Sequence, residues 1–245
     1  MIKTIVMGAG GAMGRIVCDK VNGNEEFELV AKIDASGNNA DYTSIEQYTG
    51  EADMIIDFSH HLGTKSLTDY ITTTGIPAII CTTGQDEAEM AMIEEASTHA
   101  AVFKSGNMSV GIALLTKLVK QTAAVFNTAD VEIVETHHNR KADAPSGTAL
   151  MLANAVKEVR PELHTTDGRS GAHKRTPDEI GMHAVRRGNV VGIHEVMFGT
   201  NNQTITLTHE AHDRALFADG ALDAAKFMVG KEPGMYNMDD LVADI

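Results

Sequence analysis

A short strand, a glycine cluster and a helix follow one another at the start of the chain, and this order restricts the fold more than any other feature. Lys3–Met7 is rich in β-branched residues, residues 8–14 contain four glycines, and a helical pattern continues to Val21. Glycines let the backbone turn sharply and approach a pyrophosphate, and the helix N-terminus supplies free N–H groups. The segment predicts the phosphate-binding turn of a dinucleotide fold, although glycine-rich turns also serve tight packing.

Asp34 strengthens this interpretation, because it ends a second predicted strand, Phe27–Ile33, twenty residues after Gly14. A carboxylate at this place accepts hydrogen bonds from ribose hydroxyls, and the alternative is a solvated loop aspartate. The same carboxylate would repel a 2′-phosphate, and residues 35–37 contain no arginine to offset it. The sequence therefore predicts NADH as the preferred cofactor, with NADPH as a possible second one.

Strand and helix patterns alternate through the rest of the first hundred residues. Residues 53–58, 77–81 and 101–103 read as further short strands, and residues 86–99 read as a helix. This alternation predicts an α/β fold with a Rossmann-type doubly wound parallel sheet and helices on both faces.

The pattern changes after Ser109. Apolar residues at helical spacing predict a long helix over residues 112–126, and residues 131–135 predict a strand. Residues 189–198 and 203–208 predict two neighbouring strands, the second with one buried and one wet face. We expect an α+β domain with an open mixed sheet, whose exposed face a homo-oligomer interface would cover.

Residues 135–150 carry the chemistry of the chain. His137 and His138 end a predicted strand and stand just ahead of Arg140 and Lys141. Histidine suits proton transfer near neutral pH, and a nearby lysine donates a proton or stabilises developing charge. A structural role is the usual explanation for one histidine, but two beside a lysine favour catalysis. Arg140 stays unassigned, with a solvated side chain as its simplest explanation.

A helix is expected to begin directly after this cationic stretch. Pro145 disfavours helical angles at Ala144, and Ser146 is a good N-cap. The N–H groups of Gly147 and Thr148, with the hydroxyls of Ser146 and Thr148, would bind a carboxylate or phosphate. Capping alone would also explain Ser146, but not the cations before it. No metal site is expected at the histidine pair, because no Cys, Asp or Glu stands at ligand spacing.

Charge and composition limit the partners. The formal net charge of −14 argues against nucleic acid and an anionic membrane surface, so an anionic substrate needs its own positive cluster. No apolar run is long enough to span a membrane. Two cysteines, Cys18 and Cys81, form no disulfide framework and read as small core residues, so we expect a cytoplasmic location.

Two further loops are candidates for cofactor contact. Residues 81–84, Cys-Thr-Thr-Gly, follow a predicted strand at the edge where open α/β sheets bind ligands, although a plain strand-to-helix turn explains them equally well. Residues 104–108 are either a linker between the two halves or a cofactor-contacting hinge.

With these pieces in place, the whole chain resembles the 4-hydroxy-tetrahydrodipicolinate reductase (dihydrodipicolinate reductase) family of bacterial lysine and diaminopimelate synthesis. The resemblance rests on residues 8–14, 81–84 and 107–111, and above all on residues 135–138 with 141–149, a motif highly specific to the family. Residues 187–194 and 233–236 extend it to the end of the chain.

The resemblance implies an enzyme that transfers a hydride from NAD(P)H to C4 of a cyclic dicarboxylate imine. It implies a dinucleotide-binding domain of residues 1–109 and 214–245, and a domain of residues 110–213 that binds substrate and builds a homotetramer. His137 would donate or accept a proton and Lys141 would be the second proton donor. The small dicarboxylate would be bound by His138, Ser146, Gly147 and Thr148. The cofactor would be lined by Gly8, Ala9, Gly10, Gly11, Ala12, Met13, Asp34, Cys81, Thr82, Thr83, Ser105, Gly106, Asn107 and Met108.

The chain departs from the family pattern at three places. Ala12 and Ala35 stand where some members carry arginines, which weakens a role for NADPH. Cys81 stands where glycine is usual, with little effect expected if only its backbone touches the cofactor. The loop after Asp34 is short. Two other functions stay open: a related Rossmann amino-acid dehydrogenase, and a non-catalytic nucleotide-sensing module.

Overall fold

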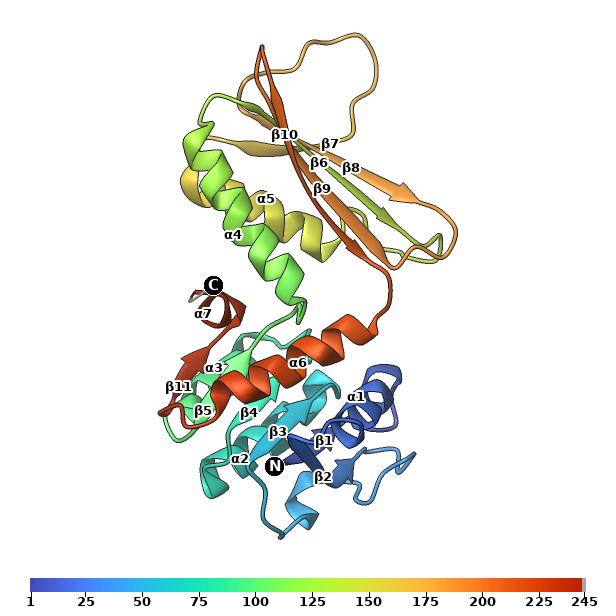
Figure 1. Ribbon diagram of the computed structural model, residues 1–245, viewed down its shortest axis with the longest axis vertical. Coiled ribbons are helices and arrows are strands. Elements are labelled where there is room, and N and C mark those ends of the chain that lie inside the picture. The colour runs from blue at the N-terminus through green and yellow to red at the C-terminus, as the bar shows by residue number, and fades with distance from the viewer. Residues whose placement is uncertain (244–245) are drawn as a thin grey trace. The chain divides into compact units, whose positions relative to one another are not determined.

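The computed structural model describes residues 1–243 and divides the chain into two compact units (Figure 1). One unit comprises Met1–Ser109 and the C-terminal segment from Arg214, and the other comprises Val110–Asp213. No helix of the described chain is long and apolar enough to cross a membrane.

The first unit is built on a parallel sheet of six strands. Their order across the sheet is β11-β5-β4-β3-β1-β2. The strands are β1 (Ile2–Met7), β2 (Phe27–Ile33), β3 (Met54–Asp57), β4 (Ala78–Ile80), β5 (Ala101–Lys104) and β11 (Gly234–Tyr236). The order reverses beside β1, which is the topological switch point at which doubly wound sheets bind ligands.

Helices cover both faces of this sheet. The chain places α1 (Ala12–Asn22) beside α6 (Ala215–Met228), and α2 (Thr64–Thr74) beside α3 (Glu87–Ser97). Short turns of 3-10 helix, η1 (Ile45–Gln47) and η2 (His61–Gly63), and the final helix α7 (Met238–Leu241) complete the unit. Alternate strand residues such as Ile5, Ile55 and Ile80 join the side chains of α2 and α3 in one core cluster. All residues of the central strands β3 and β4 are buried, so both faces of the sheet are covered, as is typical of a parallel sheet.

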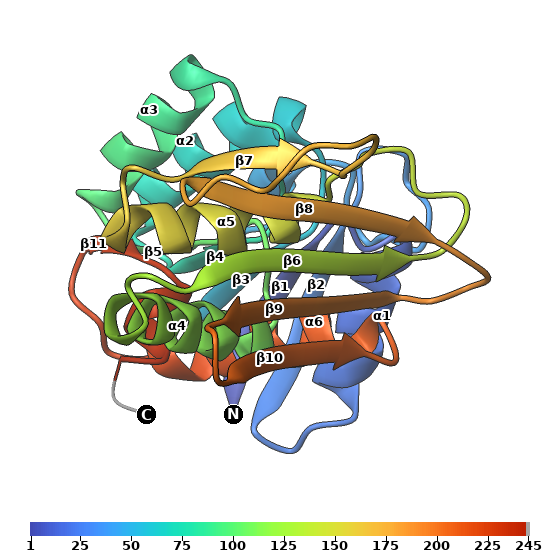
Figure 2. The ribbon, with the colours of Figure 1, turned by 90° about the horizontal axis from the view of Figure 1, so that it is seen from above.

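The second unit pairs two helices with an open mixed sheet. Its strand order is β10-β9-β6-β8-β7, with β8 parallel to both β6 and β7, and β9 antiparallel to β6 and β10 (Figure 2). The strands are β6 (Asp130–His137), β7 (His164–Asp167), β8 (Glu179–Arg186), β9 (Gly192–Gly199) and β10 (Thr204–Ala211).

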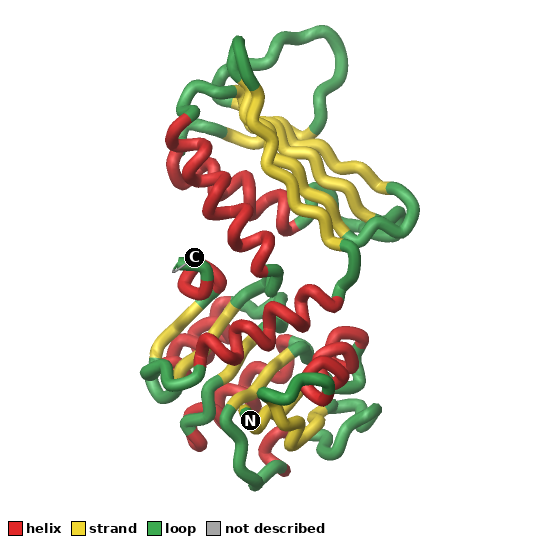
Figure 3. Tube along the Cα trace, in the orientation of Figure 1, coloured by secondary structure: helices red, strands yellow, loops and turns green. Residues whose placement is uncertain are grey.

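Helices α4 (Val110–Val125) and α5 (Gly147–Val159) pack on one face of this sheet, and no described helix covers the other (Figure 3). Val131 and Ile133 of β6 bury against these helices, because alternate residues of a strand point to the same face. The predicted fold class is thus confirmed for both sheets.

Two details differ from the sequence-based expectation. The strand predicted over residues 189–198 begins only at Gly192, because Gly188 turns the chain with φ +48° and the Asn189 side chain accepts a hydrogen bond from Arg140. Strand β8, which the sequence pattern did not reveal, inserts between β6 and β7 through long-range parallel pairing.

Candidate active site

The glycine cluster forms a tight turn between β1 and α1. Gly8 has φ +76°, and a Cβ there would lie 2.3 Å from the Phe58 carbonyl oxygen. A Cβ at Gly14 would lie 1.9 Å from the carbonyl oxygen of Gly8. Only glycine fits at these two positions, because the backbone of β3 and the first turn of α1 both approach the loop closely. Gly11 caps α1 without any side-chain hydrogen bond, which leaves the amides at the helix start to be satisfied from outside.

Asp34 lies beside this turn at the end of β2. Its Oδ2 accepts a hydrogen bond from the Gly10 amide at 2.9 Å, and its Oδ1 accepts bonds from the Ser36 amide and hydroxyl. Burial opposes the charge, but these hydrogen bonds and the Arg15 guanidinium together hold the pKa of Asp34 below its usual value. Asp34 therefore presents an ionised carboxylate next to the glycine turn.

A cavity of about 640 Å³ opens between the glycine turn and Asp34. Within the described chain its lining holds no arginine and no lysine. The lining residues are Met7, Gly8, Gly11, Ile33, Asp34, Ala35, Thr43, Ser44, Ile45, Phe58, Ser59, His60, Leu62, Gly63 and Ser66. Apolar walls with a few hydroxyls and one carboxylate suit a nucleoside without an extra phosphate.

The segments after β3, β4 and β5 meet at the same edge of the sheet. Strand register pairs Met7 with Asp57, Asp57 with Ile80, and Ile80 with Lys104. The structure therefore brings the predicted residues 81–83 and 105–108 together: the Ser105 amide donates to the Ile80 carbonyl, and a Cβ at Gly106 would lie 3.5 Å from Thr83 Cγ2.

A buried polar group supports this edge from within. Burial raises the pKa of Asp57, although Ser59, Thr82 and Lys104 favour its charge. Lys104 Nζ donates to the Thr82 carbonyl at 2.9 Å, and burial lowers the pKa of Lys104. The Cys81 thiol is buried, free and raised in pKa by that burial, which makes it a packing residue. Sequence reasoning missed the Asp57–Lys104 support, since Asp57 lay within a predicted strand and Lys104 was interpreted as the start of a linker or hinge.

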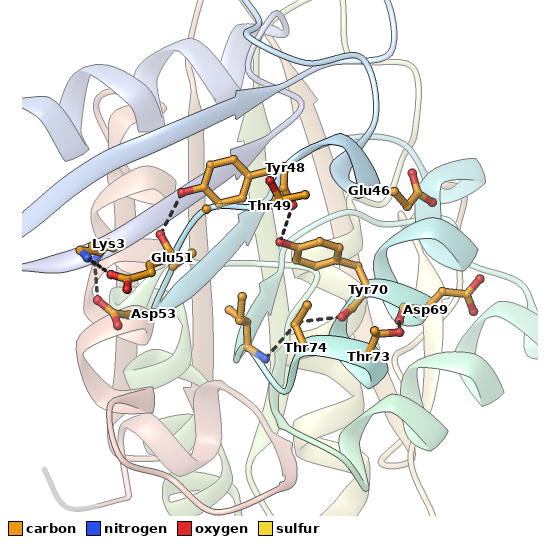
Figure 4. A pocket seen from close by; sticks show the side chains of 13 residues that line it. Lys3, Glu46, Tyr48, Thr49, Glu51, Asp53, Asp69, Tyr70, Thr73 and Thr74 are labelled. Atoms are coloured by element: carbon orange, nitrogen blue, oxygen red, sulfur yellow. Dashed lines mark hydrogen bonds and ion pairs between the residues drawn. The ribbon is translucent and has the colours of Figure 1, made fainter.

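A larger cavity, of about 820 Å³, lies at the opposite edge, where the strands begin (Figure 4). Several of its polar groups are already paired: the Tyr48 hydroxyl donates to the Glu51 carbonyl, the Tyr70 hydroxyl donates to the Tyr48 carbonyl, and Lys3 pairs with Glu51. Open α/β sheets bind ligands at the carboxyl ends of their strands, so the smaller cavity is the functional candidate.

In the second unit, β6 places Glu135 and His137 on its helix-covered face. Glu135 is 1% exposed, and its Oε2 lies 2.5 Å from His137 Nδ1. Its two oxygens also receive both terminal nitrogens of Arg186, each at 2.8 Å, and Oε1 accepts the Ser146 amide at 3.1 Å. Burial opposes ionisation of Glu135, but the bonds from Arg186 and His137 lower its pKa.

Helix α5 begins where the sequence predicted. The Ser146 hydroxyl accepts the Ala149 amide and so caps the helix. Gly147 is the first helical residue, with open space where a Cβ would lie, and Thr148 follows it. The N-cap is thus confirmed, and the start of α5 lies beside His137 because Glu135 contacts both His137 and the Ser146 amide.

His194 is a further buried member that sequence reasoning left unassigned. It pairs with Glu135 in the β6–β9 register, its Nε2 lies 3.1 Å from Ser146 Oγ, and its ring meets that of His137 edge to face at 5.1 Å. Burial, followed by the charge of His137, lowers the pKa of His194 to about 4. The available signal was the alternation within the predicted strand, in which His194 lies on the same face as Val196 and Phe198.

The loop between β6 and α5 carries the two cations. Lys141 Nζ pairs with Asp143 Oδ1 at 2.8 Å, and this bond holds the pKa of Asp143 below its usual value. Arg140 donates to the Asn189 side chain at 2.8 Å, and Arg186 donates to the Asp143 carbonyl. Lys141 is therefore linked to the Glu135 cluster through Asp143 and Arg186, whereas Arg140 contacts the neighbouring turn at Asn189. His138 directly follows the strand.

Comparison with known proteins matches both units to one family. Residues 2–108 match the family described as "Dihydrodipicolinate reductase, N-terminus", and residues 111–242 match "Dihydrodipicolinate reductase, C-terminus". The chain is 46% identical to the 4-hydroxy-tetrahydrodipicolinate reductase of Caldanaerobacter subterraneus, covering 99% of this chain and 98% of that protein. It is 43% identical to the enzyme of the same name from Clostridium tetani, covering 98% and 96% respectively.

Solved structures agree with the sequence relatives. The dipicolinate-bound dihydrodipicolinate reductase from Paenisporosarcina sp. TG-14 superposes with a TM-score of 0.83 at 25% identity, covering 99% of this chain and 100% of that one. Aspartate dehydrogenase from Thermotoga maritima, at 12% identity and a TM-score of 0.52, covers 95% and 98% of the two chains and shares the fold alone.

Proposed function

The chain belongs to the dihydrodipicolinate reductase family, and on that premise we propose that it reduces 4-hydroxy-tetrahydrodipicolinate to tetrahydrodipicolinate in lysine and diaminopimelate synthesis. In the balanced reaction, the substrate takes up one hydride and one proton and loses water. The observation that carries the proposal is the buried Glu135–His137 pair beside the start of α5, which combines a proton-transfer group with an anion site.

The first unit fits a reduced dinucleotide. The turn at Gly8 and Gly14 has no room for side chains, the start of α1 offers backbone amides, and Asp34 offers a carboxylate for ribose hydroxyls. When bound, the nicotinamide supplies the hydride for C4 of the substrate. In this proposal, as the resemblance implies, the dinucleotide would be held by residues 8–13, 81–83 and 105–108.

NADH is the preferred cofactor in this proposal. The ionised Asp34 would repel a 2′-phosphate, and the cavity beside it is lined by Ala35 rather than by a cation. Arg15 lies near enough to lower the pKa of Asp34, but it does not line that cavity and its Nε donates to the Gly10 carbonyl. NADPH is accordingly the poorer cofactor.

The second unit handles the substrate. His138, Ser146, Gly147 and Thr148 bind the two carboxylates at the positive end of α5, where backbone amides and the helix dipole favour anions. His137 and Lys141 are the proton-transfer groups, with His137 held by the rigid strand β6 and Lys141 on the adjacent loop.

Second copies of the chain cover the open face of the mixed sheet and build a tetramer. Val134, Ile193 and Met197 project from that face, on strand positions that alternate with the helix-covered ones. Val185 extends the apolar strip and is 40% exposed. Light scattering of purified protein is expected to give a mass of four chains.

We place the protein in the cytoplasm. The thiols of Cys18 and Cys81 are free, as is usual in that reducing compartment.

The test is an NADH-oxidation assay with freshly generated 4-hydroxy-tetrahydrodipicolinate. We expect rapid oxidation that depends on the substrate. Oxidation with an amino acid and not with this substrate would favour a different Rossmann dehydrogenase. Tight NADH binding without turnover of any of these compounds would favour a nucleotide-sensing module.

A further inference from the structure

Glu135 contacts four hydrogen-bonding groups, and three of them can only donate hydrogen bonds. This determines which nitrogen of the fourth group, the His137 ring, carries a hydrogen. Both terminal nitrogens of Arg186 and the backbone amide of Ser146 have only hydrogens to offer. Burial opposes ionisation of Glu135, but the Arg186 guanidinium binds both of its oxygens and lowers its pKa, so Glu135 is an ionised acceptor. Its remaining neighbour, His137 Nδ1 at 2.5 Å, must then carry a hydrogen and donate it.

This arrangement leaves Nε2 as the nitrogen of His137 that exchanges protons. The structure gives Nε2 no hydrogen bond within residues 1–243. A Cβ at Gly192 would lie only 3.1 Å from Nε2, so any larger residue at this position would crowd that nitrogen. Glycine at residue 192 therefore keeps this side of the ring open.

We propose that Glu135, held by Arg186, is a positioning residue that fixes His137 with Nδ1–H toward the protein and Nε2 toward the reacting substrate. The proposal rests on the proposed function and deepens it. Glu135 touches neither substrate nor cofactor and acts through His137.

The same carboxylate couples the proton site to the anion site. Oε1 accepts the Ser146 amide directly before the first residue of α5, so the ring of His137 and the start of the helix are tied to one rigid group. Arg186 adds a bond to the Asp143 carbonyl in the loop that carries Lys141. Changes at Glu135 consequently affect proton transfer first and carboxylate binding second.

The test compares Glu135→Gln with a matched control, Asp178→Asn. Asp178 also pairs with a histidine of the same unit, His164 of β7, but both of these side chains are exposed. Glutamine cannot accept hydrogen bonds on both of its terminal atoms, so it breaks one side of the Glu135 cluster. We expect kcat to fall about 10- to 100-fold in Glu135→Gln with the KM for NADH unchanged, and no change in the control. Unchanged kcat in folded Glu135→Gln would overturn the proposal.

A second readout does not depend on turnover. Nitrogen-15 NMR of sedimented, histidine-labelled protein distinguishes hydrogen on Nδ1 from hydrogen on Nε2, with the His137 signal identified by its loss in His137→Asn. Wild-type His137 is expected to keep Nδ1–H when neutral, and Glu135→Gln to shift it toward Nε2–H. A neutral wild-type ring protonated on Nε2 would contradict the inference.

Folding and function failures are separable. If Glu135→Gln does not fold, the double variant with Arg186→Gln removes the unpaired buried charge and carries the same two measurements. If wild-type protein turns over no substrate, the proposed function fails, while the NMR result still decides the role of Glu135.

Discussion

The Asp34 carboxylate accepts a hydrogen bond from the backbone amide of Gly10 at 2.9 Å. A group at the end of β2 is thereby tied to the turn that starts α1, at the switch point of the parallel sheet. The contact ties the shape of the glycine turn to the carboxylate that, in our proposal, selects the cofactor.

Replacing Asp34 should shift that choice. In Asp34→Ala the charge that repels a 2′-phosphate is gone, so we expect the ratio of kcat/KM for NADPH to that for NADH to rise about tenfold or more. Steady-state kinetics with both cofactors measure it. Asp41→Asn is the control, since Asp41 also accepts a backbone amide, that of Lys32, but does not line the cavity. An unchanged ratio in Asp34→Ala would remove Asp34 from cofactor selection.

Lys141→Ala should separate chemistry from cofactor binding. We expect kcat to fall about 100-fold or more while the dissociation constant for NADH changes little, because Lys141 belongs to the second unit, which in our proposal binds the substrate. Arg140→Ala is the matched control from the same loop, with kcat nearly unchanged, since Arg140 only braces Asn189. A large loss of NADH affinity in Lys141→Ala would assign Lys141 to the other site.

Lys104→Met should loosen the segment after β4. The change removes the bond to the Thr82 carbonyl and leaves the buried Asp57 without its cation. We expect a destabilisation of about 1–3 kcal/mol and a higher KM for NADH with a smaller change in kcat. Urea unfolding and steady-state kinetics measure both. Unaltered stability together with an unaltered KM for NADH would show that Lys104 does not stabilise the segment after β4.

His194 predicts a pH dependence of stability. Its pKa is about 4 in the folded protein against an ordinary 6.5, so between these values the unfolded chain binds a proton that the folded chain does not. The free energy of unfolding therefore decreases as pH falls from 6.5 to 4, by up to roughly 3 kcal/mol from this residue. Urea unfolding of wild type and His194→Gln at pH 7 and pH 5 should show the smaller loss in the variant. Equal losses would mean that His194 does not stay neutral when folded.

The sequence predicted the elements whose signals are local. Phe27–Ile33 was predicted with the bounds of β2, and the start of α5 followed from Pro145 and Ser146. The fold class followed from the alternation of strands and helices, which parallel sheets impose on the whole first unit.

The contacts that depend on long-range strand pairing could not be predicted. Arg186 reaches Glu135 because β8 lies parallel to β6 in a register that pairs His137 with Arg186, and no local pattern encodes that register. His194 joins the cluster in the same way through β9. The motif around residue 137 thus indicated the candidate proton-transfer residue, while Arg186 and His194, which complete the cluster around Glu135, come from two strands more than forty residues further along the chain.

The most direct test of the central claim follows the hydride itself. NADH carrying deuterium at the transferring C4 position is incubated with the protein and freshly generated 4-hydroxy-tetrahydrodipicolinate, and the product is examined by mass spectrometry and NMR. We expect tetrahydrodipicolinate with one deuterium at C4. Product without deuterium, or unchanged substrate in the presence of folded, NADH-binding protein, would contradict the assignment.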